Sequence, residues 1–191
     1  MKIGLFFGSF NPIHIGHQII ADQILEAAAL DKIWLVVSPQ NPFKKKQSLL
    51  NQYDRLHLTE LATEDHPKIS PTDFEFHLPI PSYTIDTLTH MQEKFPEHSF
   101  SLIMGGDNLK GLKKWKNADL LLKEYKILVY ERPGFEIEAE LKDHPSIKIF
   151  HFPQIDISST HIRKNIAENK SVKYYLHHKV EAYIKEMNLY K

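Results

Sequence analysis

The stretch "KIGLFFGSFNPIHIGH" (residues 2–17) joins a nearly continuous apolar run to a turn that is rich in glycine, proline and histidine. Such a run is typical of a strand covered on both faces, as in a parallel sheet. Apolar residues then recur at helical spacing over residues 14–30, and "KIWLVVS" (residues 32–38) has the character of a second buried strand. This strand–helix–strand unit predicts an α/β fold.

The alternation of apolar runs and amphipathic segments continues along the chain. Further strands are predicted at 99–107, 125–134 and 147–152, with a weaker candidate at 74–77. Helices are predicted at 52–63, at 85–94 and around residues 180–187. We see no internal repeat or linker and expect one domain over residues 1–191. Its fold would be a Rossmann-like, doubly wound parallel sheet with a helical C-terminal extension over about 158–191.

Composition excludes several classes of protein. Lys plus Arg and Asp plus Glu are 24 each, which argues against a strongly basic nucleic-acid binder. The apolar runs are far too short to span a membrane, and no signal peptide is visible after Met1. The absence of cysteine excludes disulfides, thiolate zinc sites and a cysteine nucleophile. We expect a cytoplasmic protein without nucleic-acid or membrane partners, and the sequence leaves open whether it forms a homo-oligomer.

The exit of the first strand carries a candidate anion site. Gly8 permits a tight turn and the close approach of a ligand, and Pro12 suits the first turn of a helix. His14 and His17 are three residues apart and share one face of that turn, with Gly16 leaving room between them. A helix start offers free N–H groups and a positive dipole end, so imidazole N–H donors there suit phosphate.

Two other interpretations of the histidine pair stay open from these residues alone. The rings could simply pack, or they could hold a metal ion. No third zinc ligand follows at a recognisable spacing. The stretch is neither G-x-G-x-x-G nor a Walker motif with its lysine, so a standard dinucleotide fold and a P-loop are not supported.

A second phosphate-suited segment, "ISSTHIR" (residues 157–163), follows the last predicted strand. Its hydroxyl residues are good N-caps for a helix, and Arg163 would emerge near that helix start, where a fixed cation can hold phosphate. The alternative is an ordinary capped helix with a surface arginine. Because ligands in doubly wound sheets bind beyond the carboxyl ends of the strands, we expect the two segments to converge there.

Together these segments resemble a known family. "GSFNPIHIGH" resembles the G-x-F-x-P-x-H-x-G-H signature of the HxGH nucleotidyltransferases, and "ISSTHIR" resembles their S-[ST]-T-x-[IV]-R signature. The resemblance implies that the first motif binds the phosphates of ATP and the second grips the triphosphate. It implies catalytic roles for His14, His17 and Arg163. It also implies ATP contacts from Gly8, Ser9, Phe10, Gly16, Ser158, Ser159 and Thr160.

Three further stretches resemble the bacterial nicotinate-nucleotide adenylyltransferases within this superfamily: "PSYT" (81–84), "GGDNLKGLKKW" (105–115) and "ERPG" (131–134). The resemblance implies that main-chain amides at Tyr83 and Thr84 meet the carboxylate of the pyridine ring. It implies contacts with ATP at Gly105 and Asp107, whose carboxylate would accept bonds from ribose hydroxyls. Trp115 would stack on the pyridine and Arg132 would approach a phosphate.

Read alone, each of these residues has a plainer interpretation. "PSYT" and Asp107 could cap helices, Trp115 could pack in the core, and Arg132 could be a solvated turn residue. The chain also departs from the family, because many bacterial members have P-P-H-[KR] where this sequence has "NPFKKK" (41–46), without histidine. We assign Lys45 to ATP, with Lys44 and Lys46 as alternatives, and a solvated loop accounts for the rest.

The resemblance implies an enzyme of NAD biosynthesis that joins ATP and nicotinate mononucleotide into nicotinate adenine dinucleotide and pyrophosphate. The attacking phosphate is already anionic, so no general base is needed. Mg²⁺ would bind through the substrate phosphates, since no dedicated carboxylate cluster or other metal site is visible. The alternatives are nicotinamide mononucleotide or pantetheine phosphate as acceptor, and a non-catalytic nucleotide-sensing module.

Overall fold

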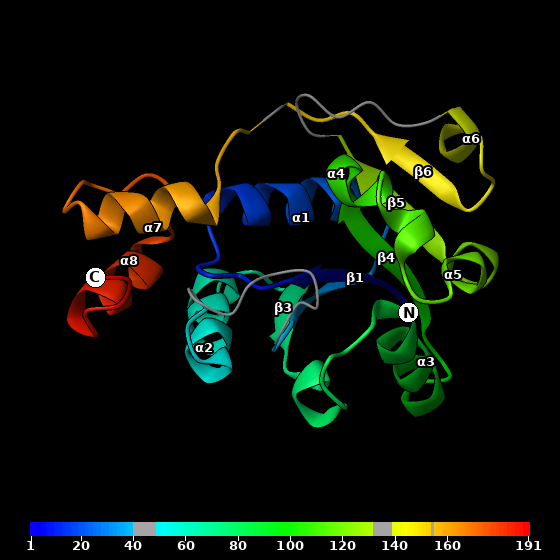
Figure 1. Ribbon diagram of the computed structural model, residues 1–191, viewed down its shortest axis with the longest axis horizontal. Helices are drawn as coiled ribbons and strands as arrows, with labels where there is room; N and C mark the ends of the chain where they lie inside the picture. The colour runs from blue at the N-terminus through cyan, green and yellow to red at the C-terminus, as the bar shows by residue number, and fades with distance from the viewer. Residues whose placement is uncertain (40–48, 132–138, 154) are drawn as a thin grey trace.

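A six-stranded sheet forms the centre of the molecule in the computed structural model, which describes residues 1–39, 49–131, 139–153 and 155–191 (Figure 1). Every strand pairing is parallel, and the order is β3-β2-β1-β4-β5-β6. The strands are β1 (Lys2–Gly8), β2 (Lys32–Val37), β3 (Ile69–Thr72), β4 (Ser99–Gly105), β5 (Lys126–Tyr130) and β6 (Ile147–Phe150). The order reverses between β1 and β4, so the predicted doubly wound sheet is confirmed.

Helices cover both faces of this sheet. They are α1 (Ile15–Ala27), α2 (Gln52–Thr63), α3 (Thr84–Lys94), α4 (Gly106–Leu109), α5 (Ala118–Glu124), α6 (Ala139–Lys142), α7 (Ser159–Ala167) and α8 (His178–Glu186), with 3₁₀ turns η2 (Phe74–His77) and η3 (Leu112–Lys114). Helices α7 and α8 form the predicted C-terminal extension, beside α2 in Figure 1. Within the described residues, no helix is both long and apolar enough to cross a membrane.

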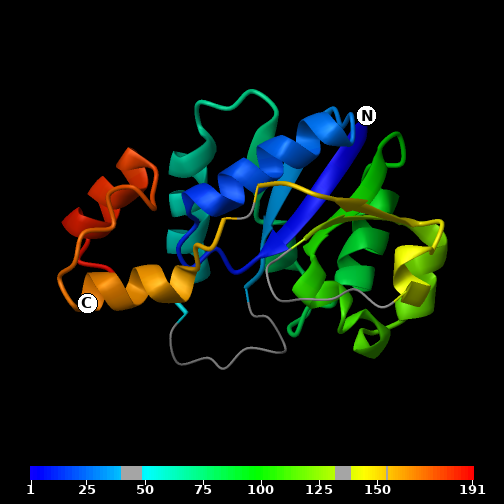
Figure 2. The same cartoon turned by 90° about the horizontal axis from the view of Figure 1, so that it is seen from above.

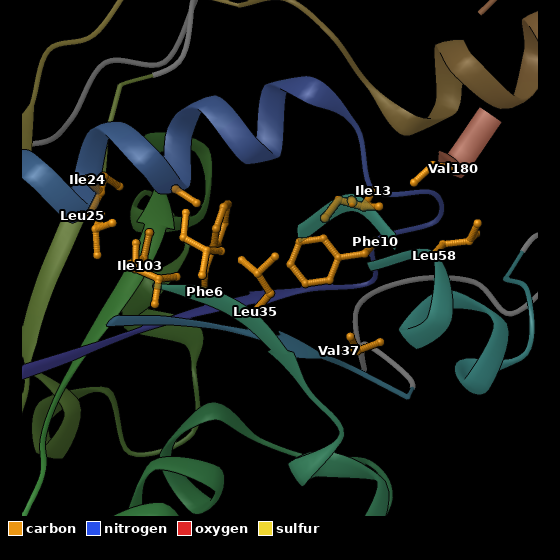
Figure 3. Packing of buried hydrophobic residues seen from close by; sticks show 14 of the residues in the cluster. Phe6, Phe10, Ile13, Ile24, Leu25, Leu35, Val37, Leu58, Ile103 and Val180 are labelled. Carbon is orange, nitrogen blue, oxygen red and sulfur yellow. The ribbon is translucent and has the colours of Figure 1, made fainter. Parts of the chain in front are cut away.

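The alternation of side chains along the strands divides the core into two layers. Phe6 faces a cluster with residues of α1, α2, α7 and α8, whereas Ile3 and Leu5 face a second cluster with residues of α3, α4 and α5. Figure 3 shows part of the first cluster, in which Ile24 and Leu25 of α1 face Phe6. Burial on both faces explains why the central strands are almost continuously apolar.

The prediction for the third strand was wrong. Residues 74–77 form η2, not a strand, and β3 lies just before them at Ile69–Thr72. The sequence of β3, "ISPT", has a proline and little apolar alternation, which an edge strand tolerates. Phe74 and Phe76 alternate with polar residues, which is the pattern of a strand, but these four residues form a 3₁₀ turn.

Several element ends also differ from the prediction. The predicted strand at 99–107 ends at Gly105, which caps α4, and β5 ends at Tyr130. Helix α1 begins at Ile15, so His14 is its N-cap and Pro12 precedes the helix. It stops at Ala27, because Ala29 is left-handed (φ 50°) and the Leu30 N–H bonds to the Leu25 carbonyl at 3.0 Å, as in a Schellman cap.

Candidate active site

A cavity of about 370 Å³ opens beyond the carboxyl ends of β1 and β4, where the strand order reverses. Its walls come from the exits of both strands and from the start of α7. Many of the predicted site residues line it: Gly8, Ser9, Phe10, His14, His17, Asp107, Trp115, Ser158, Ser159, Thr160 and Arg163. The structure therefore brings both phosphate motifs and one acceptor motif to a single cavity.

The two histidines form a stacked pair at the start of α1. Their ring centroids are 3.7 Å apart and the ring planes differ by 27°. The backbone N–H of His14 donates to Nδ1 of His17 at 3.2 Å. Because Nδ1 accepts this bond, the neutral His17 ring carries its proton on Nε2. In that tautomer, Nε2–H of His17 is a donor suited to a phosphate oxygen.

The neighbours of this pair explain the spacing of the first motif. The Phe10 ring is 2% exposed and meets the His17 ring edge-on, with centroids 5.2 Å apart, so it supports that ring. A Cβ on Gly8 would lie 2.7 Å from a carbon of the Phe10 ring. A Cβ on Gly16 would lie 3.0 Å from Nδ1 of His14. Both glycines therefore make room for the rings.

The second motif bonds directly to the first, as their placement after strands predicts. Ser158 caps α7 by accepting a bond from the His161 N–H at 3.2 Å. Ser159 Oγ donates to the Pro12 carbonyl at 2.9 Å, and Arg163 Nη1 donates to the Asn11 carbonyl at 2.8 Å. Figures 1 and 2 show the first turn of α7 beside the start of α1. Arg163 thus lies in the same cavity as the histidine pair.

On the β4 side, Asp107 follows the strand on the short helix α4. A Cβ on Gly105 would collide with Oδ1 of Asp107, so a larger residue there would require that carboxylate to move. Trp115 ends η3, where it lines the cavity and packs on the second core cluster. Its two interpretations, core packing and contact with a ligand, are therefore compatible.

The "PSYT" segment leads into α3, with Tyr83 as its N-cap and Thr84 as its first residue. Lys116 joins this segment to the one that carries Trp115: its Nζ lies 4.9 Å from the Tyr83 ring centroid and 2.7 Å from Oδ2 of Asp86. As formed by the described residues, the cavity is lined neither by Tyr83 nor by Thr84. The predicted residues Lys44, Lys45, Lys46 and Arg132 lie outside the described part of the chain.

Sequence reasoning missed Arg55 of α2, which is only 1% exposed. Its guanidinium donates to the backbone carbonyls of Ser9 (2.6 Å), Ser38 (2.8 Å), Leu50 (3.0 Å) and Pro39 (3.1 Å). Burial lowers the pKa of Arg55 to about 10, so the group stays charged at neutral pH. Arg55 therefore ties the loops that follow β1 and β2. Its signal was its position on the apolar face of α2, three residues before Leu58.

Glu75 was also missed, and it is 2% exposed beneath the "PSYT" segment. Thr87 Oγ1 of α3 donates to its Oε1 at 2.8 Å. Burial raises the pKa of the Glu75 carboxyl, against the opposing effect of the hydrogen bond from the Thr87 hydroxyl. This carboxyl therefore connects η2 to α3.

Comparison with known proteins agrees with this geometry. Residues 5–165 match the family model described as cytidylyltransferase-like. A probable nicotinate-nucleotide adenylyltransferase of Flavobacterium psychrophilum is 53% identical over 192 residues, and the match covers 100% of each chain. The chain belongs to this family of nucleotidyltransferases. The corresponding protein of Flavobacterium johnsoniae is 54% identical over the same span, again with 100% of both chains covered.

Solved structures extend the likeness beyond bacteria. The Plasmodium falciparum nicotinic acid mononucleotide adenylyltransferase, complexed with NaAD, superposes on this family member with a TM-score of 0.85. The two sequences are 26% identical, and the match covers 99% of this chain and 97% of the other. The two proteins therefore share their fold although their sequences are only 26% identical.

Proposed function

We propose that this enzyme transfers the adenylyl group of ATP to the 5′-phosphate of nicotinate mononucleotide. The products are nicotinate adenine dinucleotide and pyrophosphate, a step of NAD biosynthesis. The observation that carries the proposal is the convergence of His14, His17 and Arg163 on one cavity at the sheet's switch point. The names of the bacterial relatives and the NaAD complex of the Plasmodium enzyme support the acceptor.

The chemistry asks mainly for positioning and charge stabilisation. A phosphate oxygen of the mononucleotide attacks the α-phosphorus of ATP, a new P–O bond forms, and pyrophosphate leaves with the electron pair of the broken bond. His17 Nε2–H donates to an oxygen of the transferred phosphoryl group. Arg163 offsets the charge that develops on the leaving pyrophosphate, aided by Lys45 of the loop after β2. Arg132 binds the nicotinate mononucleotide, near a phosphate.

Mg²⁺ enters this proposal with the substrates. Among the residues that the structure describes, no cluster of three or more His, Cys, Asp or Glu side chains is arranged to hold a metal ion. A Mg²⁺ ion that arrives with ATP needs few protein ligands, because phosphate oxygens and water supply most of its coordination. When bound, Mg²⁺ neutralises charge on the triphosphate, while His14, His17 and Arg163 hold the phosphate groups in place.

The acceptor is tested by comparing initial rates of pyrophosphate release with ATP and each of three acceptors. We expect nicotinate mononucleotide to be preferred, because the backbone amides at the start of α3 suit a carboxylate. A preference for nicotinamide mononucleotide would overturn the role given to Tyr83 and Thr84. Preference for pantetheine phosphate would overturn the acceptor class. Release with none of the three would leave a nucleotide-sensing module.

A further inference from the structure

The turn that follows α8 reaches back to the phosphate-binding loop. Asn188 is left-handed (φ 52°), and the Leu189 N–H bonds to the Ile184 carbonyl at 3.0 Å, which ends α8 as a Schellman cap. Tyr190 donates its hydroxyl proton to Oδ1 of Asn11 at 2.9 Å, across 179 positions of sequence.

Asn11 is the junction of three segments. It is only 6% exposed, between Phe10 and Pro12 of the first motif. Its side-chain Oδ1 accepts bonds from Tyr190 and from the backbone N–H of Leu50 at 3.3 Å. Its backbone carbonyl accepts the bond from Arg163 Nη1 at 2.8 Å. The Tyr190 hydroxyl therefore fixes the residue whose carbonyl holds the arginine of the second motif.

The protonation state of Tyr190 agrees with this direction of donation. Burial raises the pKa of the phenol well above its ordinary value, although the Arg163 and Arg55 guanidinium groups act in the opposite sense. The phenol is therefore neutral under ordinary conditions and donates a proton to Asn11. The hydrogen bond between Tyr190 and Asn11 therefore joins two neutral groups, whereas the nearby guanidinium groups of Arg163 and Arg55 are charged.

We propose that Tyr190 is a positioning residue for ATP: through Asn11, its hydroxyl holds Arg163 where the triphosphate binds. This inference rests on the proposed function, because it assigns ATP to the cavity. Tyr190 acts through Asn11 and touches no reacting atom.

The direct test is Tyr190→Phe, which removes only the hydroxyl. The dissociation constant of ATP, measured by calorimetric titration in the absence of acceptor, should rise about fivefold, the effect of one hydrogen bond between neutral groups. The KM for nicotinate mononucleotide should stay within about twofold, since Arg163 contacts the other substrate. The matched control is Tyr183→Phe in α8, whose ring packs on His57 with centroids 4.7 Å apart, and it should bind ATP as the wild type does.

A double-mutant cycle distinguishes positioning from a general structural role. In an Asn11→Ala background the hydroxyl has lost its acceptor, so Tyr190→Phe should change ATP affinity no further. Three results would overturn the proposal: unchanged ATP affinity in Tyr190→Phe, full additivity in the cycle, or an equal loss in Tyr183→Phe. Wild-type protein that binds ATP but releases no pyrophosphate would contradict the proposed function alone, because the titration needs no acceptor.

Discussion

Two regions of the candidate site are held in different ways: the cavity with its phosphate motifs, called here the phosphate end, and the "PSYT" segment outside the described cavity lining, called the acceptor end. At the phosphate end, Arg163 and Arg55 donate to backbone carbonyls, and a neutral phenol donates to Asn11, whose carbonyl accepts the bond from Arg163. At the acceptor end, helix α3, which the "PSYT" segment begins, is bonded to the buried carboxyl of Glu75 through Thr87 and forms an exposed ion pair between Asp86 and Lys116. Carbonyls do not titrate, whereas carboxyls do. We therefore expect the bonds of Arg163 and Arg55 to persist over a wide range of pH and salt, and the acceptor end to respond to both.

The largest effect should come from His17→Ala at the phosphate end. Loss of one preorganised donor to the reacting phosphoryl group typically lowers kcat by about 10²–10³. ATP affinity should change less than kcat, because His17 acts on the group being transferred. Steady-state kinetics measures both, and His66→Ala, a surface histidine paired with Asp22, is the control. Near-normal turnover in a folded His17→Ala protein would remove His17 from the mechanism.

Next in size is Arg55→Leu, which leaves four partly buried carbonyls without their donor. Each buried orphan costs about 1–3 kcal/mol before the loops relax, so we expect a loss of about 3 kcal/mol or more. In a chain of this size that lowers Tm by about 6–12 °C, readable by calorimetry. A Tm equal to that of the wild type would mean that the two loops do not depend on this clamp.

A smaller, pH-dependent effect is expected from Glu75→Gln at the acceptor end. Because folding raises the pKa of this carboxyl, the folded state loses stability as the pH rises from the ordinary value of 4.5 through the raised one. The amide variant avoids that loss. Its Tm should exceed that of the wild type at neutral pH by about 2–4 °C, the shift produced by about 1 kcal/mol.

The sign of this effect is checked by lowering the pH. Below 4.5 the wild-type carboxyl is protonated in both states, so the advantage of Glu75→Gln should vanish. A difference in Tm that stays constant with pH would show that packing, not titration, separates the two proteins.

The smallest effect should come from Lys116→Ala, which breaks an exposed ion pair and the contact with the Tyr83 ring. Exposed pairs contribute about 0.2–1 kcal/mol. The KM for nicotinate mononucleotide should therefore rise at most about fivefold at low salt, and the difference should disappear near about 1 M salt. The KM for ATP should not change, and a larger change for ATP would contradict the separation of the two ends.

Local patterns explain how much of the fold could be predicted. The central strands are buried on both faces, so each is a recognisable apolar run, and α1 has clear helical spacing. The strand β3 has no such run. It lies at the edge of the sheet and pairs with β2 alone, and its sequence is "ISPT". Its position was therefore predicted five residues too late, on η2.

The candidate site divides in the same way. His14, His17 and Arg163 were identifiable because phosphate chemistry fixes their residue types within short motifs. The residues that support them, Arg55 and Tyr190, were not identifiable. Arg55 bonds to Ser9 across 46 positions of sequence, and Tyr190 bonds to Asn11 across 179. No local pattern encodes such pairs. The contributions of Lys45 and Arg132 remain predictions.

The most direct test of the two-ended site is a crystal structure of this enzyme with nicotinate adenine dinucleotide. We predict that the phosphate derived from ATP lies within about 3 Å of His17 Nε2, with Arg163 on the side from which pyrophosphate has left. The pyridine carboxylate should meet the backbone amides at Tyr83 and Thr84, with the ring on Trp115. A dinucleotide bound with its diphosphate away from His17, or with its pyridine away from the start of α3, would contradict the account.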